Sequence, residues 1–89
     1  MELFEAHLTD EQLTQLCTEL DTSATISEVK CRPGDSVDVE MRVAIRGLMA
    51  RELSAVQVTY CYQEQVWCDT FIREANLTKL MRWGPVESV

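Results

Sequence analysis

The segment Ser54–Arg73 is the feature that most constrains the fold, because apolar and polar residues alternate along it in two successive runs. The apolar positions of the first run are Val56, Val58, Tyr60 and Tyr62. A period of two places such residues on one face of a β-strand. Trp67 and Phe71 continue the alternation in the second run, so the segment predicts two antiparallel strands joined by a turn.

The turn of this hairpin falls within Gln63–Val66, and a four-residue loop there gives the same register as a two-residue loop at Glu64-Gln65. Two-residue turns favour Asn and Gly, so we predict the four-residue loop. The predicted cross-strand pairs are Tyr62 with Trp67, Tyr60 with Asp69, Val58 with Phe71, and Cys61 with Cys68. This register gathers the large rings on one face. Asp69 lies on that face, where we expect it to accept a hydrogen bond from the hydroxyl of a diagonal tyrosine.

The segment Leu8–Asp21 predicts the N-terminal helix. Thr9 is a suitable N-cap, and Gln12, three residues later, completes a capping box. One buried face of this helix is predicted by the i, i+3, i+4, i+7 spacing of Leu13, Leu16, Cys17 and Leu20. The preceding residues, Met1–His7, either begin this helix early or pair with an edge of the sheet.

Four further segments complete the predicted fold. Thr22–Arg32 is interpreted as an edge strand with Thr25, Ser27, Val29 and Cys31 facing inward, and the alternation in Val37–Ile45 predicts a half-buried strand. Gly47–Leu53 is either a short helix or the turn of a second hairpin, and we favour the turn because it sets Ile45 against Val56. Ala75–Trp83 predicts a short helix that stops at Gly84-Pro85. The chain is therefore expected to be a single α+β domain, residues 1–89, in which a four-stranded antiparallel meander carries the N-terminal helix on one face and a short C-terminal helix beside it.

Charge is distributed unevenly. The net charge is −7, yet residues 1–28 hold seven acids and no Lys or Arg, whereas residues 29–89 hold eight acids and eight bases. An acidic helix without compensating bases predicts docking on the basic surface of another protein. The predicted contact residues are Glu5, Asp10, Glu11, Glu19 and Asp21. The same charge disfavours a nucleic-acid partner.

An acidic N-terminus and the lack of a long apolar run predict a cytoplasmic protein without a membrane segment.

Sequence motifs point to binding rather than catalysis. One histidine and three isolated glycines give no catalytic or phosphate-binding signature, so we predict a non-catalytic protein without a cofactor. A second hypothesis is a metal- or thiol-responsive protein that uses Cys61 and Cys68. A third is a ligand-binding or enzymatic domain with a pocket between sheet and helices, lined by Tyr60, Tyr62, Trp67 or Asp69. The other sheet face is rather apolar for a solvent-exposed surface, so we expect that either the C-terminal helix or a second copy of the chain, in a homodimer through the sheet, covers it. The residues of this face are Thr59, Cys61, Val66, Cys68, Thr70 and Ile72.

Overall fold

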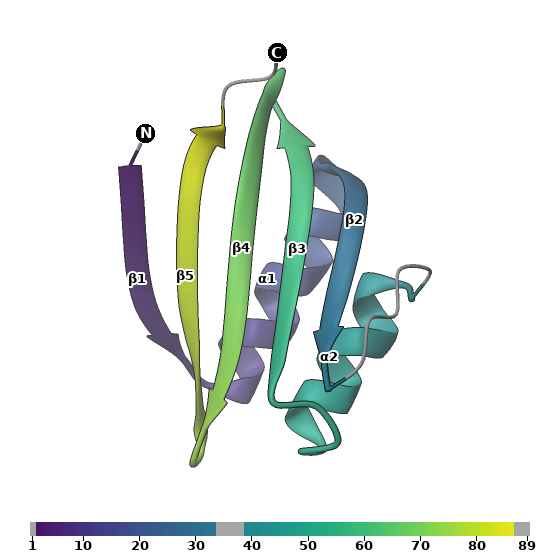
Figure 1. Ribbon diagram of the computed structural model, residues 1–89, viewed down its shortest axis with the longest axis vertical. Coiled ribbons are helices and arrows are strands. Elements are labelled where there is room, and N and C mark those ends of the chain that lie inside the picture. Colours follow the sequence, from purple (N-terminus) through teal and green to yellow (C-terminus); the bar gives the residue numbers. More distant parts are fainter. Residues whose placement is uncertain (1, 34–38, 87–89) are drawn as a thin grey trace.

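A five-stranded antiparallel sheet with both helices on one of its faces forms the fold in the computed structural model, which describes residues 2–33 and 39–86 (Figure 1). The elements in chain order are β1 (Glu2–Leu8), α1 (Asp10–Ser23), β2 (Thr25–Arg32), α2 (Met41–Met49), β3 (Ala55–Tyr62), β4 (Gln65–Glu74) and β5 (Leu77–Val86). The strands lie in the order β1-β5-β4-β3-β2, so the first and last strands of the chain are neighbours. The predicted α+β class with an antiparallel sheet is confirmed, but the sheet has five strands instead of four, and the first helix follows a strand.

Helix α1 begins where its capping signals predict. The Thr9 hydroxyl accepts a hydrogen bond from the Gln12 backbone N–H, and the Gln12 side chain accepts one from the Thr9 N–H. These two bonds satisfy donors that a helix start otherwise leaves unpaired. Leu13, Cys17 and Leu20 are buried as their spacing predicts.

The central hairpin is confirmed, with a register two residues away from the predicted one. Its turn is the two-residue pair Gln63-Glu64, with φ angles of 50° and 65°, so the predicted four-residue loop is wrong. Tyr60 therefore faces Trp67, and Val58 faces Asp69. A shift of two residues leaves every side chain on its predicted face, which is why the aromatic face is still formed.

The predicted strand Val37–Ile45 is wrong over its described part. Residues 37 and 38 lie outside the described residues, and helix α2 begins at Met41. Its buried residues are Met41, Ala44, Ile45 and Leu48, which also follow helical spacing. The predicted second hairpin is therefore wrong as well. Strand β2 occupies the place beside β3 that this hairpin would have filled, and α2 covers the face of the sheet.

The predicted C-terminal helix is also wrong, because Leu77–Val86 forms strand β5. This strand fits between β4 and β1 and pairs with both, so its backbone groups find ladder partners on two sides. The N-terminal residues pair with the sheet, which decides the alternative that the sequence left open. The predicted edge strand β2 is confirmed, and Val29 and Cys31 face inward. Thr25 and Ser27 are exposed, because a β-bulge between Ile26 and Glu28 changes the alternation.

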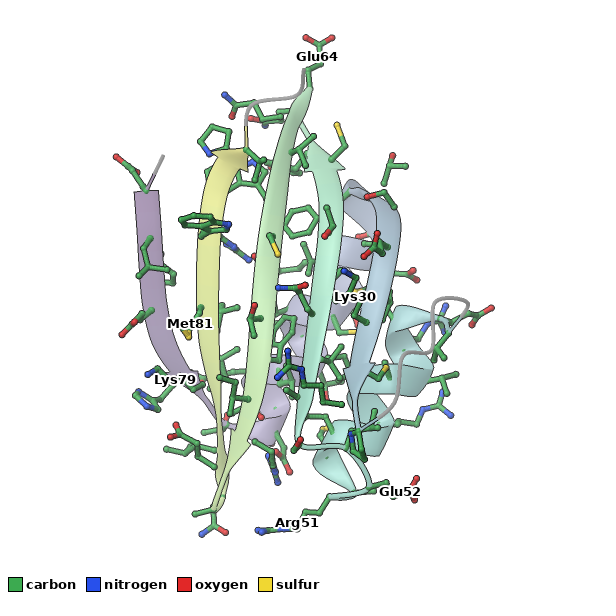
Figure 2. All side chains as sticks on the ribbon, in the orientation of Figure 1. Lys30, Arg51, Glu52, Glu64, Lys79 and Met81 are labelled. Atoms are coloured by element: carbon green, nitrogen blue, oxygen red, sulfur yellow. The ribbon has the colours of Figure 1, made fainter. Side chains whose placement is uncertain are left out.

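The two faces of the sheet differ in cover. The face under α1 and α2 holds one core cluster that consists of Leu13, Cys17, Leu20, Val29, Cys31, Met41, Ala44, Ile45, Leu48, Val56, Val58, Tyr60, Phe71 and Leu80. The other face carries no helix within the described ranges, and Figure 2 shows Lys30, Lys79 and Met81 on it. Neither described helix has the length and apolar character required to cross a bilayer.

Candidate functional site

A buried ion pair lies at the centre of the helix-covered face. Asp69 of β4 and Arg82 of β5 are direct cross-strand partners, and the Asp69 side chain has no solvent exposure. The guanidinium donates two parallel hydrogen bonds, from Nε to Asp69 Oδ1 and from Nη2 to Oδ2, each 2.9 Å long. This bidentate geometry is the strongest that arginine makes with a carboxylate, and it neutralises a charge that could not otherwise remain buried.

Tyr60 completes the network. Its hydroxyl donates a 3.0 Å hydrogen bond to Asp69 Oδ1. The sequence predicts a bond to Asp69 from a diagonal tyrosine, and the two-residue shift in register places Tyr60 at the diagonal position instead of directly opposite Asp69. Burial, and then the nearby Asp69 carboxylate, raise the pKa of Tyr60 far above its ordinary value. The hydrogen bonds to Asp69 raise the pKa of Arg82, so its guanidinium stays charged. Tyr60 is therefore protonated and Arg82 is charged at neutral pH.

A cavity of about 450 Å³ lies beside this network, between the C-terminal half of α1 and the sheet. Its sheet side is lined by the rings of Tyr60, Tyr62 and Trp67 together with Arg82. Its helix side is lined by Leu16, Glu19, Leu20 and Ser23. Of these rings, Tyr62 is 40% exposed to solvent, whereas Tyr60 is only 3% exposed.

Trp67 is positioned by a glycine of the neighbouring strand. Gly84 of β5 has φ +153°, and a Cβ built there would lie 2.8 Å from Trp67 Cε3. The ring therefore rests directly on the β5 backbone, which only glycine permits at this position. Gly84 thus determines how deeply Trp67 sits in the wall of the cavity.

The electrostatic character of the cavity favours a cation. The charge of Arg82 is already neutralised by Asp69, which leaves the exposed Glu19 as the other charged group in the lining. Ser23 is the last residue of α1, and the final turn of this helix contains no basic residue. A helix C-terminus carries roughly half a negative charge, so it adds to the field of Glu19.

The predicted contact acids do not form one surface. Asp10 makes an ion pair with Arg73 at 2.6 Å, and Asp21 makes one with Arg42 at 3.1 Å. Glu5 lies on the sheet face away from the helices, opposite Met81 on β5. Glu11 and Glu19 are exposed on α1, and only Glu19 borders the cavity.

The cysteines are less closely associated than predicted. Cys61 faces Val66 and Cys68 faces Thr59, so the predicted direct opposition of the two thiols is wrong. Cys17 and Cys31 are buried on the helix-covered side. Burial raises the pKa of the Cys68 thiol, which disfavours the reactive thiolate. Among residues 2–33 and 39–86, no group of three or more His, Cys, Asp or Glu side chains is placed to hold a metal ion.

Sequence reasoning identified the three rings and Asp69, and it predicted Glu19 as a contact residue, but it missed Arg82 and Gly84. Arg82 falls within the predicted helix Ala75–Trp83. Its spacing of two residues from Leu80 and of four from Thr78, which places all three on one strand face, is the signal that indicates its position. Comparisons with protein-family models, with curated proteins and with solved structures found no match.

Proposed function

We propose that this chain is a non-catalytic interaction module that binds a basic partner protein by holding a lysine or arginine side chain in the cavity between α1 and the sheet. One observation carries the proposal. Three aromatic rings and the carboxylate of Glu19 line a cavity whose arginine is already neutralised by a buried aspartate. The cavity lies within the range of about 300–1,000 Å³ that is typical of binding sites for small groups.

The chemistry of the lining supports a cationic group with an apolar stem. An ammonium or guanidinium over an aromatic face gains about 0.5–2 kcal/mol, depending on how far it is desolvated. Leu16 and Leu20 offer apolar surface to the methylene stem, while Glu19 and the α1 C-terminus attract the charge. An anion would meet Glu19 and would find the Arg82 guanidinium already engaged.

The remaining acids act at longer range. A net charge of −7 raises the rate at which a basic partner is encountered, even where individual carboxylates have partners within the chain. In this proposal Glu11 contributes to attraction, whereas Glu19 contributes to both attraction and contact. The four cysteines are free, which fits the further proposal that the protein works in the reducing cytoplasm.

The test is a titration with short lysine- and arginine-rich peptides, monitored by isothermal titration calorimetry. Two variants, Glu19→Gln and Glu11→Gln, remove the same charge from the same helix, but only the first alters the cavity. We expect Glu19→Gln to weaken binding roughly fivefold, as for an ion pair of about 1 kcal/mol, and to exceed the effect of Glu11→Gln. Trp67→Leu should weaken it by roughly 2- to 30-fold through loss of the cation–π contact.

Two results would contradict the proposal. One is equal weakening by the two charge variants, which would indicate general attraction to the acidic chain without use of the cavity. The other is binding of glutamate-rich peptides with the same affinity as the basic ones. Affinity should also fall as salt is raised, because both the long-range and the contact terms are screened.

A further inference from the structure

The two edges of the sheet are protected to different degrees. Strand β2 forms one edge of the sheet (Figure 1). It contains a β-bulge, carries Lys30 and Arg32, and is followed by Pro33. Bulges, lysines and prolines are the devices by which natural proteins prevent an edge from pairing with another chain. Strand β2 therefore has a protected edge.

Strand β1 at the opposite edge has none of these features. It pairs with β5 over seven consecutive residues without a register shift, and it contains no proline, lysine or arginine. Leu3 and Phe4 are 56% and 55% exposed, although they are large and apolar. No described residue pairs with the outer side of β1, so its outward N–H and C=O groups are available to another strand.

We propose that β1 pairs antiparallel with β1 of a second copy of this chain, around a two-fold axis at Ala6. The axis stands perpendicular to the sheet, so residues that face each other must share a sheet face. With the axis at Ala6, Glu5 faces His7 of the second copy, and Phe4 faces Leu8 of the second copy. Each pairing occurs twice by symmetry.

Charge and size favour this register over the two that are centred on Glu5 and Phe4. An axis at Glu5 would place the two Glu5 carboxylates directly opposite each other, which is destabilising. An axis at Phe4 would place Glu5 against the apolar Leu3. The axis at Ala6 sets a carboxylate against an imidazole and an apolar side chain against an apolar one, with the smallest side chain at the centre.

The groups around His7 permit the pairing. His7 Nε2 lies 3.3 Å from a Glu74 carboxylate oxygen, and Lys79 is its cross-strand neighbour on β5. An imidazolium donates from both ring nitrogens, so in that form Nδ1 can bond to Glu5 of the second copy while Nε2 bonds to Glu74. Helix α1 begins at Asp10, and in Figure 1 it runs behind the sheet and away from the outer edge of β1. The five residues from Phe4 to Leu8 are therefore accessible along that edge.

The first test is sedimentation velocity over a concentration series of the full chain. We expect a monomer–dimer equilibrium for the natural sequence and a monomer for Phe4→Lys, because a lysine on the edge disfavours pairing. Val43→Lys is the matched control, since Val43 is also exposed (52%) but lies on α2. A monomer at every concentration, or equal loss of the dimer in both variants, overturns the proposal. Circular dichroism of each variant verifies that the fold is retained.

A charge exchange tests the register. His7→Glu sets two carboxylates against each other and should weaken the dimer roughly tenfold, because two cross-strand pairs change from attraction to repulsion. Adding Glu5→His restores opposite partners and should restore dimerisation. Failure of this rescue, with both variants folded, overturns the register centred on Ala6.

A disulfide cross-link tests the same register. An Ala6→Cys variant, made after Cys61 and Cys68 are replaced by serine, should form a disulfide-linked dimer. Absence of that product under oxidation counts against the proposal.

Discussion

Replacement of Arg82 by methionine tests the buried network most directly. Asp69 is fully buried and accepts three hydrogen bonds, at 2.9, 2.9 and 3.0 Å, of which Arg82 donates two. Breaking a buried ion pair from one side costs about 3–5 kcal/mol, because the remaining charge is uncompensated. The Arg82 side chain is 28% exposed, so water can replace part of the lost interaction. We therefore expect a loss of about 3 kcal/mol in the free energy of unfolding.

Urea denaturation followed by circular dichroism measures this loss, with Arg42→Met as the matched control. Arg42 also pairs with an aspartate, but the side chains of Arg42 and Asp21 are 64% and 45% exposed. Pairs of that kind contribute at most about 1 kcal/mol. Addition of Asp69→Asn to Arg82→Met should recover part of the stability, because it removes the buried charge. Equal losses for the two arginine variants, or no recovery in the double variant, would refute the reasoning.

Three further changes have expected outcomes. The free energy of unfolding should fall as pH rises above about 10. The unfolded state ionises its tyrosines there, whereas the raised pKa of Tyr60 keeps this residue protonated in the folded state. Tyr60→Phe should make the fall shallower when stability is measured over a series of alkaline pH values. Gly84→Ala should displace the Trp67 ring, because the added Cβ would overlap it. The near-ultraviolet circular dichroism should change and the binding of basic peptides should weaken. An unchanged spectrum would contradict the contact between Gly84 and the Trp67 ring. Thr9→Ala should lower the free energy of unfolding by about 1 kcal/mol through loss of the capping box with Gln12, as measured in urea, and a loss below a few tenths would show that the cap contributes little.

The errors in the predicted fold share a cause: some segments satisfy two periodicities. Residues 41–45 alternate as a strand would, yet Met41, Ala44 and Leu48 also form a helical stripe. The outcome depends on which positions of the sheet other strands occupy. Strands β2 and β4 take both sides of β3, so this segment buries its apolar residues as a helix on the face.

Only part of the candidate site could be predicted from the sequence. Tyr60, Trp67 and Asp69 lie on one hairpin, and their alternation alone placed them on one face. Arg82 reaches Asp69 only because β5 inserts beside β4, a pairing between segments that local sequence does not specify. The predicted partner surface changed likewise, because Arg73 and Arg42 approach Asp10 and Asp21 from distant positions in the chain.

The sequence by itself determined what depends on near neighbours: the start of α1 at its capping box, the face of each residue in the central hairpin, and the edge strand β2. These features arise from bonds and alternation within a few residues. Only the tertiary structure decided the placement of β5 between β1 and β4, the helical state of α2, and the turn at Gln63-Glu64. The physical reason is that long-range ladder pairing and burial in a shared core outweigh weak local preferences, including the disfavoured positive φ angles of that turn.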